Sequence, residues 1–264
     1  MASFPTPTDI RPGTGRRGGS PTAAALVVGD ELLSGKVREA NVEVLARALR
    51  ELGVVLQRAV VVMDDVGAIA DEVTRLCSSH DWLFTSGGIG PTHDDRTIEA
   101  AAKAFGVPVV TSPDLANRLL KHYGAECTEA HLRMALVPFG AVLEAESDSH
   151  WPAIRFDNTW LLPGVPEAFR MKIPIIMKRI RIATPACPFV SHAVHVRLDE
   201  GRLKPMLDAV VSRFGDVAIG SYPRWVEHGA ITKITFDGLD EPQVLEARGA
   251  LIALLPSGEI DAVD

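Results

Sequence analysis

Residues 82–97, WLFTSGGIGPTHDDRT, decide the fold. Trp82–Thr85 is a short, mainly apolar run, which predicts a strand. Glycines follow at once, and we expect a helix from about Asp95 to Phe105 that stops at Gly106. A glycine-rich turn between a strand and a helix brings backbone N–H groups to a helix N-terminus, where a phosphate binds favourably. The segment therefore predicts an α/β fold with an anion-binding loop.

The alternation of strand and helix continues on both sides of this segment. Apolar residues spaced for one helical face run from Val42 to Leu52, and Asp65 is placed to cap a second such helix. Ser112 and Pro113 have the types expected at the start of a further helix. The predicted strands are Ala23–Val28, Val54–Val62 and Trp82–Thr85, with an appended hairpin of Ala153–Phe156 and Thr159–Leu162. This order predicts a three-layer α/β/α fold around a mostly parallel sheet.

The length of 264 residues favours two domains. Residues 1–20 are rich in Pro, Gly and Thr, so we expect a disordered tail. The first domain is predicted at 21–182. Prolines interrupt the pattern near 183–188, and a second, smaller α/β domain is predicted at 188–264.

Composition excludes several classes of function. The chain has 27 basic and 34 acidic residues, a net charge of -7, which counts against a nucleic-acid partner. Its apolar runs are too short to span a bilayer, so we expect no membrane partner. Its three cysteines are far apart and favour neither a disulfide framework nor a zinc site. We therefore expect a cytoplasmic location.

Acidic side chains follow the predicted parallel strands, at the edge where open sheets bind ligands. They are Asp30, Glu31, Asp64, Asp65, Asp94 and Asp95. A divalent cation would relieve their repulsion and could bridge to substrate phosphates. Alternatively, half of them are helix caps or solvated charges, as we expect for Asp65 and for one of the pair Asp94 and Asp95.

Three motifs together resemble a known family. They are GDELLSG at 29–35 with Asn41, SGGIGPT-x-DD-x-T at 86–97, and LPGVPE at 162–167. In this order they resemble the molybdopterin-binding-type domain of competence/damage-inducible protein A (CinA), over residues 23 to about 180. The following region, including IGSYP at 219–223, is similar to the small domain that follows this module in eukaryotic-type FAD synthases.

The resemblance implies a fold shared with molybdenum cofactor biosynthesis proteins, a homo-oligomer (dimer or trimer), and a nucleotide or pterin as the small-molecule ligand. It also implies a divalent metal ion (Mg, Mn or Co), with molybdopterin as one candidate ligand. Asp64 and Asp95 match the acidic pair around the metal, and with Asp94 they are the predicted catalytic residues. The predicted phosphate- and nucleotide-binding residues are Gly29, Asp30, Glu31, Asn41, Ser86, Gly87, Gly88, Gly90, Thr92, Thr97, Pro163, Gly164 and Glu167.

Two segments depart from the CinA pattern and leave the substrate open: His131, Arg133 and Met134, and residues 149–153. Trp151 could stack on a base or flavin ring, or be buried in the hairpin. The leading hypothesis is a metal-dependent nucleotide pyrophosphatase that acts on ADP-ribose or FAD. The alternatives are a non-catalytic molybdopterin or nucleotide binding protein, and a regulatory or assembly module with a vestigial pocket. Because the chain ends at Asp264, we expect neither an amidohydrolase nor an FAD synthase.

Overall fold

The computed structural model describes residues 20–145, 147, 150–183, 187–226 and 229–264. The chain forms two compact units, residues 1–186 and 187–264. The predicted tail, apart from Ser20, lies outside the described residues.

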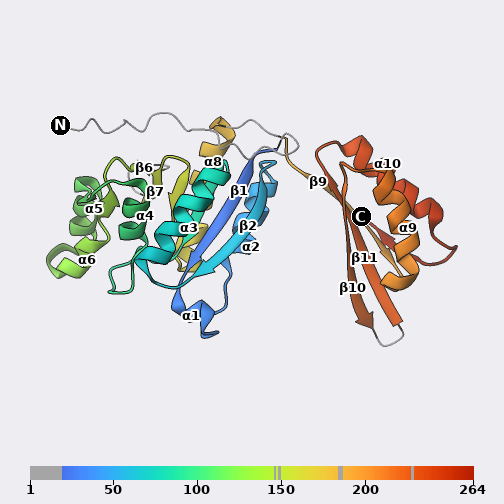
Figure 1. The fold of residues 1–264 in the computed structure, drawn as a ribbon, viewed down its shortest axis with the longest axis horizontal. Coiled ribbons are helices and arrows are strands. Elements are labelled where there is room, and N and C mark those ends of the chain that lie inside the picture. Colours follow the sequence, from blue (N-terminus) through green and yellow to red (C-terminus); the bar gives the residue numbers. More distant parts are fainter. Residues whose placement is uncertain (1–19, 146, 148–149, 184–186, 227–228) are drawn as a thin grey trace. The chain divides into compact units, whose positions relative to one another are not determined.

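The first unit is built on a six-stranded sheet (Figure 1). Its strands, in spatial order, are β2 (Val55–Val62), β1 (Thr22–Val28), β3 (Trp82–Ser86), β8 (Thr159–Leu161), β7 (Ala153–Phe156) and β6 (Val142–Glu144). The first four strands in this order are parallel, and β7 is antiparallel to both of its neighbours. The hairpin β7–β8 forms as predicted, with Asp157 in its turn at φ 52°. It is part of the sheet, because β8 pairs with β3.

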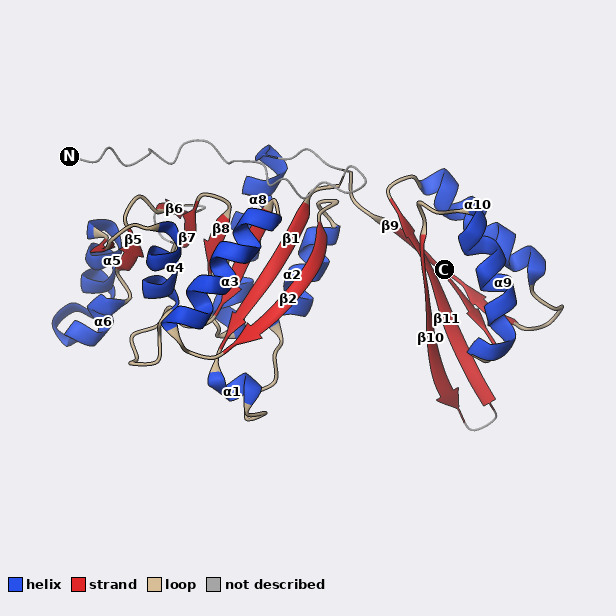
Figure 2. Cartoon of the chain, in the orientation of Figure 1, coloured by secondary structure: helices blue, strands red, loops and turns tan. Residues whose placement is uncertain are grey.

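Helices cover both faces of this sheet (Figure 2). Ala23 and Ala25 of β1 pack with α2 (Asn41–Arg50) and α8 (Ile173–Ala183). The alternate residues of β1, such as Leu26, pack with α3 (Val66–Ser79) and α4 (Thr97–Phe105) on the other face. Since successive strand residues point to opposite faces, a strand between two helical layers must be apolar throughout. The predicted three-layer α/β/α fold is confirmed.

Most helix ends follow the predicted chemistry. The Asp65 side chain accepts a hydrogen bond from the Ala68 amide at the start of α3. Gly106, at φ 67°, ends α4 in the left-handed conformation that glycine adopts without strain. Ser112 caps α5 (Pro113–Tyr123) through the Leu115 amide. The predicted helix start at Asp95 is wrong, since α4 begins at Thr97.

Several short elements were not predicted from the sequence. They are α1 (Asp30–Leu33), β4 (Val109–Thr111), the 3-10 helix η1 (Gly124–Glu126), α6 (Glu129–Arg133), β5 (Leu136–Pro138), β6 (Val142–Glu144) and α7 (Pro166–Arg170). Each of these is three to five residues long, too short to show a periodic pattern. The longer helix α8 was not predicted either.

The second unit is an antiparallel sheet with two helices. Its elements are β9 (Val190–Val196), α9 (Glu200–Arg213), β10 (Ala218–Val226), β11 (Gly229–Gly238), α10 (Glu241–Leu254) and β12 (Ile260–Val263). The strand order is β10-β11-β9-β12. Side chains from both helices, including Leu203 and Val244, pack against Val194, Ile234 and Phe236. The strand β12 was not predicted. Among the described residues of the whole chain, no helix has the length and apolarity to cross a membrane.

Candidate functional site

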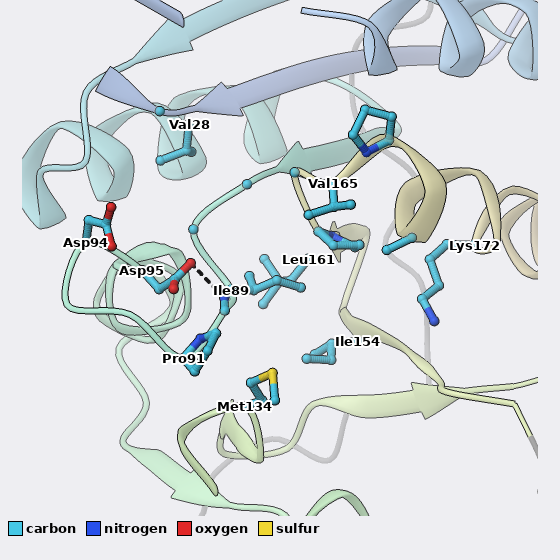
Figure 3. A pocket seen from close by; sticks show the side chains of 18 of the residues that line it. Val28, Ile89, Pro91, Asp94, Asp95, Met134, Ile154, Leu161, Val165 and Lys172 are labelled. Atoms are coloured by element: carbon cyan, nitrogen blue, oxygen red, sulfur yellow. Dashed lines mark hydrogen bonds between the residues drawn. The ribbon is translucent and has the colours of Figure 1, made fainter. Parts of the chain in front are cut away.

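The ends of three parallel strands meet at one edge of the first unit's sheet. Val28 at the end of β1 pairs with Val62 of β2, and Val27 pairs with Ser86 at the end of β3. The loops that follow these strands border a cavity of about 650 Å³ (Figure 3). The ligand-binding edge predicted from the strand order is thus a real depression.

Close contacts require glycine at two positions of the loop after β3. A Cβ atom on Gly87 would lie 2.3 Å from the Val28 carbonyl oxygen. Gly88 adopts φ +68°, and a Cβ there would lie 2.3 Å from the Thr97 hydroxyl oxygen. Thr97 holds the loop in turn, because its hydroxyl donates to the Gly87 carbonyl at 2.8 Å and its amide to the Gly88 carbonyl at 2.9 Å.

The Asp95 carboxylate holds the second half of this loop. One oxygen accepts from the Gly90 amide at 2.7 Å, and the other accepts from the Thr92 amide at 2.7 Å and the Thr92 hydroxyl at 2.6 Å. The Gly87 amide donates to the Leu162 carbonyl. The amides of Gly87, Gly90 and Thr92, which were expected to hold phosphate, are therefore already engaged within the chain.

Two neighbouring backbone amides of the loop are not engaged in this way. Those of Gly88 and Ile89 have no acceptor among the described residues. Both residues line the cavity, so these amides are available as donors to an anion.

Asn41 joins the loop to the LPGVPE segment from behind the cavity wall. It is 4% exposed, and its Nδ2 donates to the Ser86 hydroxyl at 2.9 Å and to the Gly164 carbonyl at 2.8 Å. Hydrogen bonds made by a buried amide are costly to lose, because its partners then lack both water and protein. Asn41 and Ser86 therefore support the site rather than line the main cavity.

Five carboxylates lie on the glycine-loop side of the cavity: Glu31, Asp64, Asp94 and Asp95 line it, and Asp30 is bonded to Asp64 beside it. Asp64 accepts from the Asp30 amide at 2.9 Å, and its own amide donates to the Asp30 carboxylate at 3.3 Å. Burial raises the pKa of Asp64, and the negative charges of Asp30, Glu31 and Asp94 raise it further. The repulsion expected from the sequence is thus present.

The same carboxylates do not form a metal site as they are placed. Within the described part of the chain, no three His, Cys, Asp or Glu side chains come together as metal ligands. Both oxygens of Asp95 are engaged by the loop, and Asp64 bonds to the Asp30 amide. The predicted metal role of Asp64 and Asp95 remains a prediction.

The predicted site residues divide into two groups. Those that line the cavity are Gly29, Glu31, Asp64, Gly87, Gly88, Gly90, Asp94, Asp95, Pro163 and Gly164. Those outside the lining of this cavity are Asp30, Asn41, Ser86, Thr92, Thr97 and Glu167. The Glu167 side chain is 79% exposed and lies 3.9 Å from Arg170, so it is directed to solvent.

The apolar wall of the cavity was largely missed from the sequence. It includes Ile89, Pro91, Met134, Trp151, Ile154, Leu161 and Val165. Met134 and Trp151 both belong to segments that depart from the CinA pattern. Trp151 precedes β7 rather than lying within the hairpin. The residue lines the cavity, and its half-buried side chain packs against the core cluster that includes Leu115 and Ile154.

Lys172 is the most informative residue missed from the sequence. It lies between α7 and α8, is 4% exposed, and lines the cavity on the side opposite Asp94 and Asp95 (Figure 3). Its Nζ donates to the Trp151 carbonyl. Among the described lining residues no other Lys, Arg or His is present. Burial lowers the pKa of Lys172 to about 8. The sequence feature that could have indicated Lys172 is its position as the single charged residue in the apolar run Met171–Ile176.

Comparison with known proteins agrees with this architecture. Residues 24–181 match the family described as "Probable molybdopterin binding domain". The chain belongs to this family. Residues 188–264 match the family "FAD synthase, middle domain". The predicted resemblance is confirmed for both units.

Individual relatives point the same way. A "Probable FAD synthase" of Caenorhabditis elegans is 30% identical over 263 residues, covering 90% of this chain and 50% of that protein. A protein of Archaeoglobus fulgidus is 30% identical over 220 residues, covering 83% of this chain and 92% of that one. The solved structure of the protein CinA from Thermoplasma acidophilum has a TM-score of 0.56 at 29% identity, covering 61% of this chain and 98% of that one. The chain spans about half the length of the curated FAD synthase relatives that it matches.

These findings correct two predictions. The metal-dependent pyrophosphatase is wrong, because two relatives are named "Probable FAD synthase" and the second unit matches an FAD synthase domain. In the structure the Asp95 carboxylate holds the glycine loop, a role that was not predicted from the sequence. The exclusion of an FAD synthase is wrong as well. It relied on where the sequence ends, which carries no information about activity.

Proposed function

We propose that this chain takes part in FAD synthesis and that its first unit binds a flavin nucleotide, FMN or FAD. The relatives named FAD synthase and the FAD synthase middle domain support this assignment. The match to a molybdopterin-binding family supports a heterocyclic ligand in the first unit.

The observation that carries the proposal is the composition of the cavity. Its volume of about 650 Å³ falls within the range of about 300–1,000 Å³ that is usual for ligand sites. Its interior is apolar, while residues 88–95 of the glycine loop and the carboxylates beside them are exposed or half-buried. A flavin nucleotide has the same division, with a flat ring at one end and charged phosphate at the other.

We place the ring among the apolar side chains and the phosphate at the loop. Trp151 would stack on the ring, a contact worth about 0.5–1.5 kcal/mol beyond its burial. The amides of Gly88 and Ile89 would donate to phosphate oxygens close to the N-terminal end of α4. This arrangement places the charged group nearest to water.

A pterin is the second candidate, and the match to the molybdopterin-binding family favours it. Pterins and flavins share the pteridine ring system, so both present similar hydrogen-bonding edges to the cavity. The flavin has an additional benzenoid ring, which would occupy more of the apolar wall.

The proposal is tested by titrating the whole chain into FMN, FAD, riboflavin and 6-hydroxymethylpterin and following ligand fluorescence. We expect saturable binding with one site, with FMN and FAD competing for it and both binding more tightly than the pterin. Tighter binding of the pterin would replace the flavin by the second candidate.

A blocking variant tests the location. Val165 lines the cavity and is 61% exposed, so Val165→Trp fills the cavity without disturbing the core. Val211, 49% exposed on α9 of the second unit, is the matched control. Flavin binding that survives Val165→Trp as well as Val211→Trp would refute the placement of the ligand in this cavity.

A further inference from the structure

We infer that Lys172 recognises the ring end of the ligand, by donating a hydrogen bond to a carbonyl oxygen on the pyrimidine ring that flavins and pterins share. This inference rests on the proposed function and specifies which end of the ligand lies deepest in the cavity.

The ammonium group of Lys172 occupies an unusual position. A charged side chain that is 4% exposed loses its hydration, and it is tolerated only where acceptors replace the water. An ammonium group has three donors, and among the described residues the Trp151 carbonyl accepts from it. An additional acceptor would therefore stabilise the buried charge, and a ligand in the cavity is placed to supply it.

The surroundings of Lys172 suit a neutral carbonyl better than a phosphate. Trp151, Ile154 and Val165 line the same cavity, and no second cation lines it among the described residues. A phosphate in such apolar surroundings would lose its own hydration and gain one cation in return. A ring carbonyl requires a single donor and carries no net charge.

Polar groups are distributed unevenly along the cavity. Figure 3 shows Lys172 on one side, Asp94 and Asp95 on the other, and the apolar side chains of Ile89 and Leu161 between them. A ligand that joins a flat ring to a phosphate can reach both sides only in one orientation. With the phosphate at the exposed loop, the ring carbonyls point towards Lys172.

A lysine in this position would also affect the chemistry of the ring. A positive charge beside the pyrimidine carbonyl stabilises the negative charge that a flavin ring gains on reduction. The reduction potential of bound FMN should therefore be higher in the wild-type chain than in a variant without this charge. A purely structural role for Lys172 would leave the potential unchanged.

The test compares riboflavin with FMN, since the two differ only in the phosphate. Dissociation constants are measured by flavin fluorescence for the wild-type chain, Lys172→Met, Lys172→Gln and the control Lys178→Met. Lys178 is a lysine on α8 that lies outside the cavity lining, so the control makes the same substitution close by in the chain.

We expect Lys172→Met to weaken the binding of riboflavin and of FMN by the same factor, about ten- to hundredfold. This is the usual effect of losing a hydrogen bond to a charged group. Lys172→Gln keeps an N–H donor without the charge, so it should lose less of the affinity for both ligands. It replaces the Met variant in the test if that variant does not fold. Wild-type affinity should fall as the pH rises from about 7 to 9, while that of Lys172→Met should not. Lys178→Met should bind both ligands as the wild-type chain does.

Two results would overturn the inference while flavin binding stands. A loss confined to FMN would place Lys172 at the phosphate, and an unchanged affinity for both ligands would mean that it does not contact the ligand. If flavins fail to bind to the wild-type chain but 6-hydroxymethylpterin binds, and Lys172→Met weakens it, the inference holds and the flavin assignment fails. If neither ring binds, both are wrong.

Discussion

Replacing Lys172 by Met should stabilise the ligand-free chain at neutral pH. The pKa of this lysine falls from its ordinary value of 10.5 to about 8 because the ammonium group is buried. A pKa change of one corresponds to about 1.4 kcal/mol, so holding the charge in this place costs about 3.5 kcal/mol of folding free energy. Met has a similar length and no charge. Loss of the bond between the charged group and the Trp151 carbonyl takes back about 1.5–3 kcal/mol, which leaves a gain of about 0.5–2 kcal/mol at pH 7.

The gain should depend on pH in a definite direction. Between about pH 8 and 10.5 the unfolded wild-type chain binds a proton at Lys172 that the folded chain has lost. The free energy of unfolding rises with pH wherever the unfolded state binds more protons. Because of this lysine, the stability of the wild-type chain therefore increases as the pH rises through that window. Lys172→Met has no such group. Its advantage should therefore shrink above pH 8 and disappear before pH 10.5.

Urea unfolding followed by tryptophan emission measures the stability difference between Lys172→Met and the wild-type chain in the first unit. Trp82 and Trp160 of the first unit are at most 1% exposed, whereas Trp225 of the second unit is 79% exposed. The emission shift on unfolding therefore reports mainly the first unit. Lys178→Met is the control and should leave the midpoint unchanged at every pH. A less stable Lys172→Met chain at pH 7, or a difference that does not change between about pH 7 and 10, would refute the reasoning.

Three further substitutions test the site. Asn41→Ala removes the hydrogen bonds that join Ser86 to Gly164, so the unfolding free energy measured in urea titrations should fall by about 1–3 kcal/mol and the affinity for FMN should decrease. Unchanged stability and unchanged affinity would contradict the supporting role of Asn41. Asp95→Asn should weaken FMN equally with and without Mg²⁺, because the carboxylate holds the loop; a loss seen only with Mg²⁺ would favour a metal role. Asp64→Asn should bind FMN about two- to fivefold more tightly than the wild-type chain at low salt, because one charge that repels the phosphate is lost. Its affinity for riboflavin should not change. An equal change for both ligands would argue against placing the phosphate at the glycine loop.

The layered fold could be predicted from local patterns alone. A short apolar run such as Ala23–Val28 that recurs between predicted helices favours a strand between two layers. The caps at Asp65 and Ser112 act through bonds to neighbouring residues. Glycines at 87 and 88 marked a loop of close backbone approach. These features depend on contacts within a few residues or on the side-chain period, and both are visible in a sequence.

The roles of individual site residues depended on contacts between distant segments. Asp95 could be a metal ligand, a helix cap or a loop anchor, and only the positions of the Gly90 and Thr92 amides show that it anchors the loop. Lys172 is 21 residues from its acceptor in the chain, and its burial follows from the packing of helices against the sheet. Residue types and periodicity thus determined the layers and the edge of the sheet where the cavity lies. Tertiary structure decided which polar atoms remain free to meet that ligand, because hydrogen-bond partners and desolvation are set by neighbours that are remote in sequence.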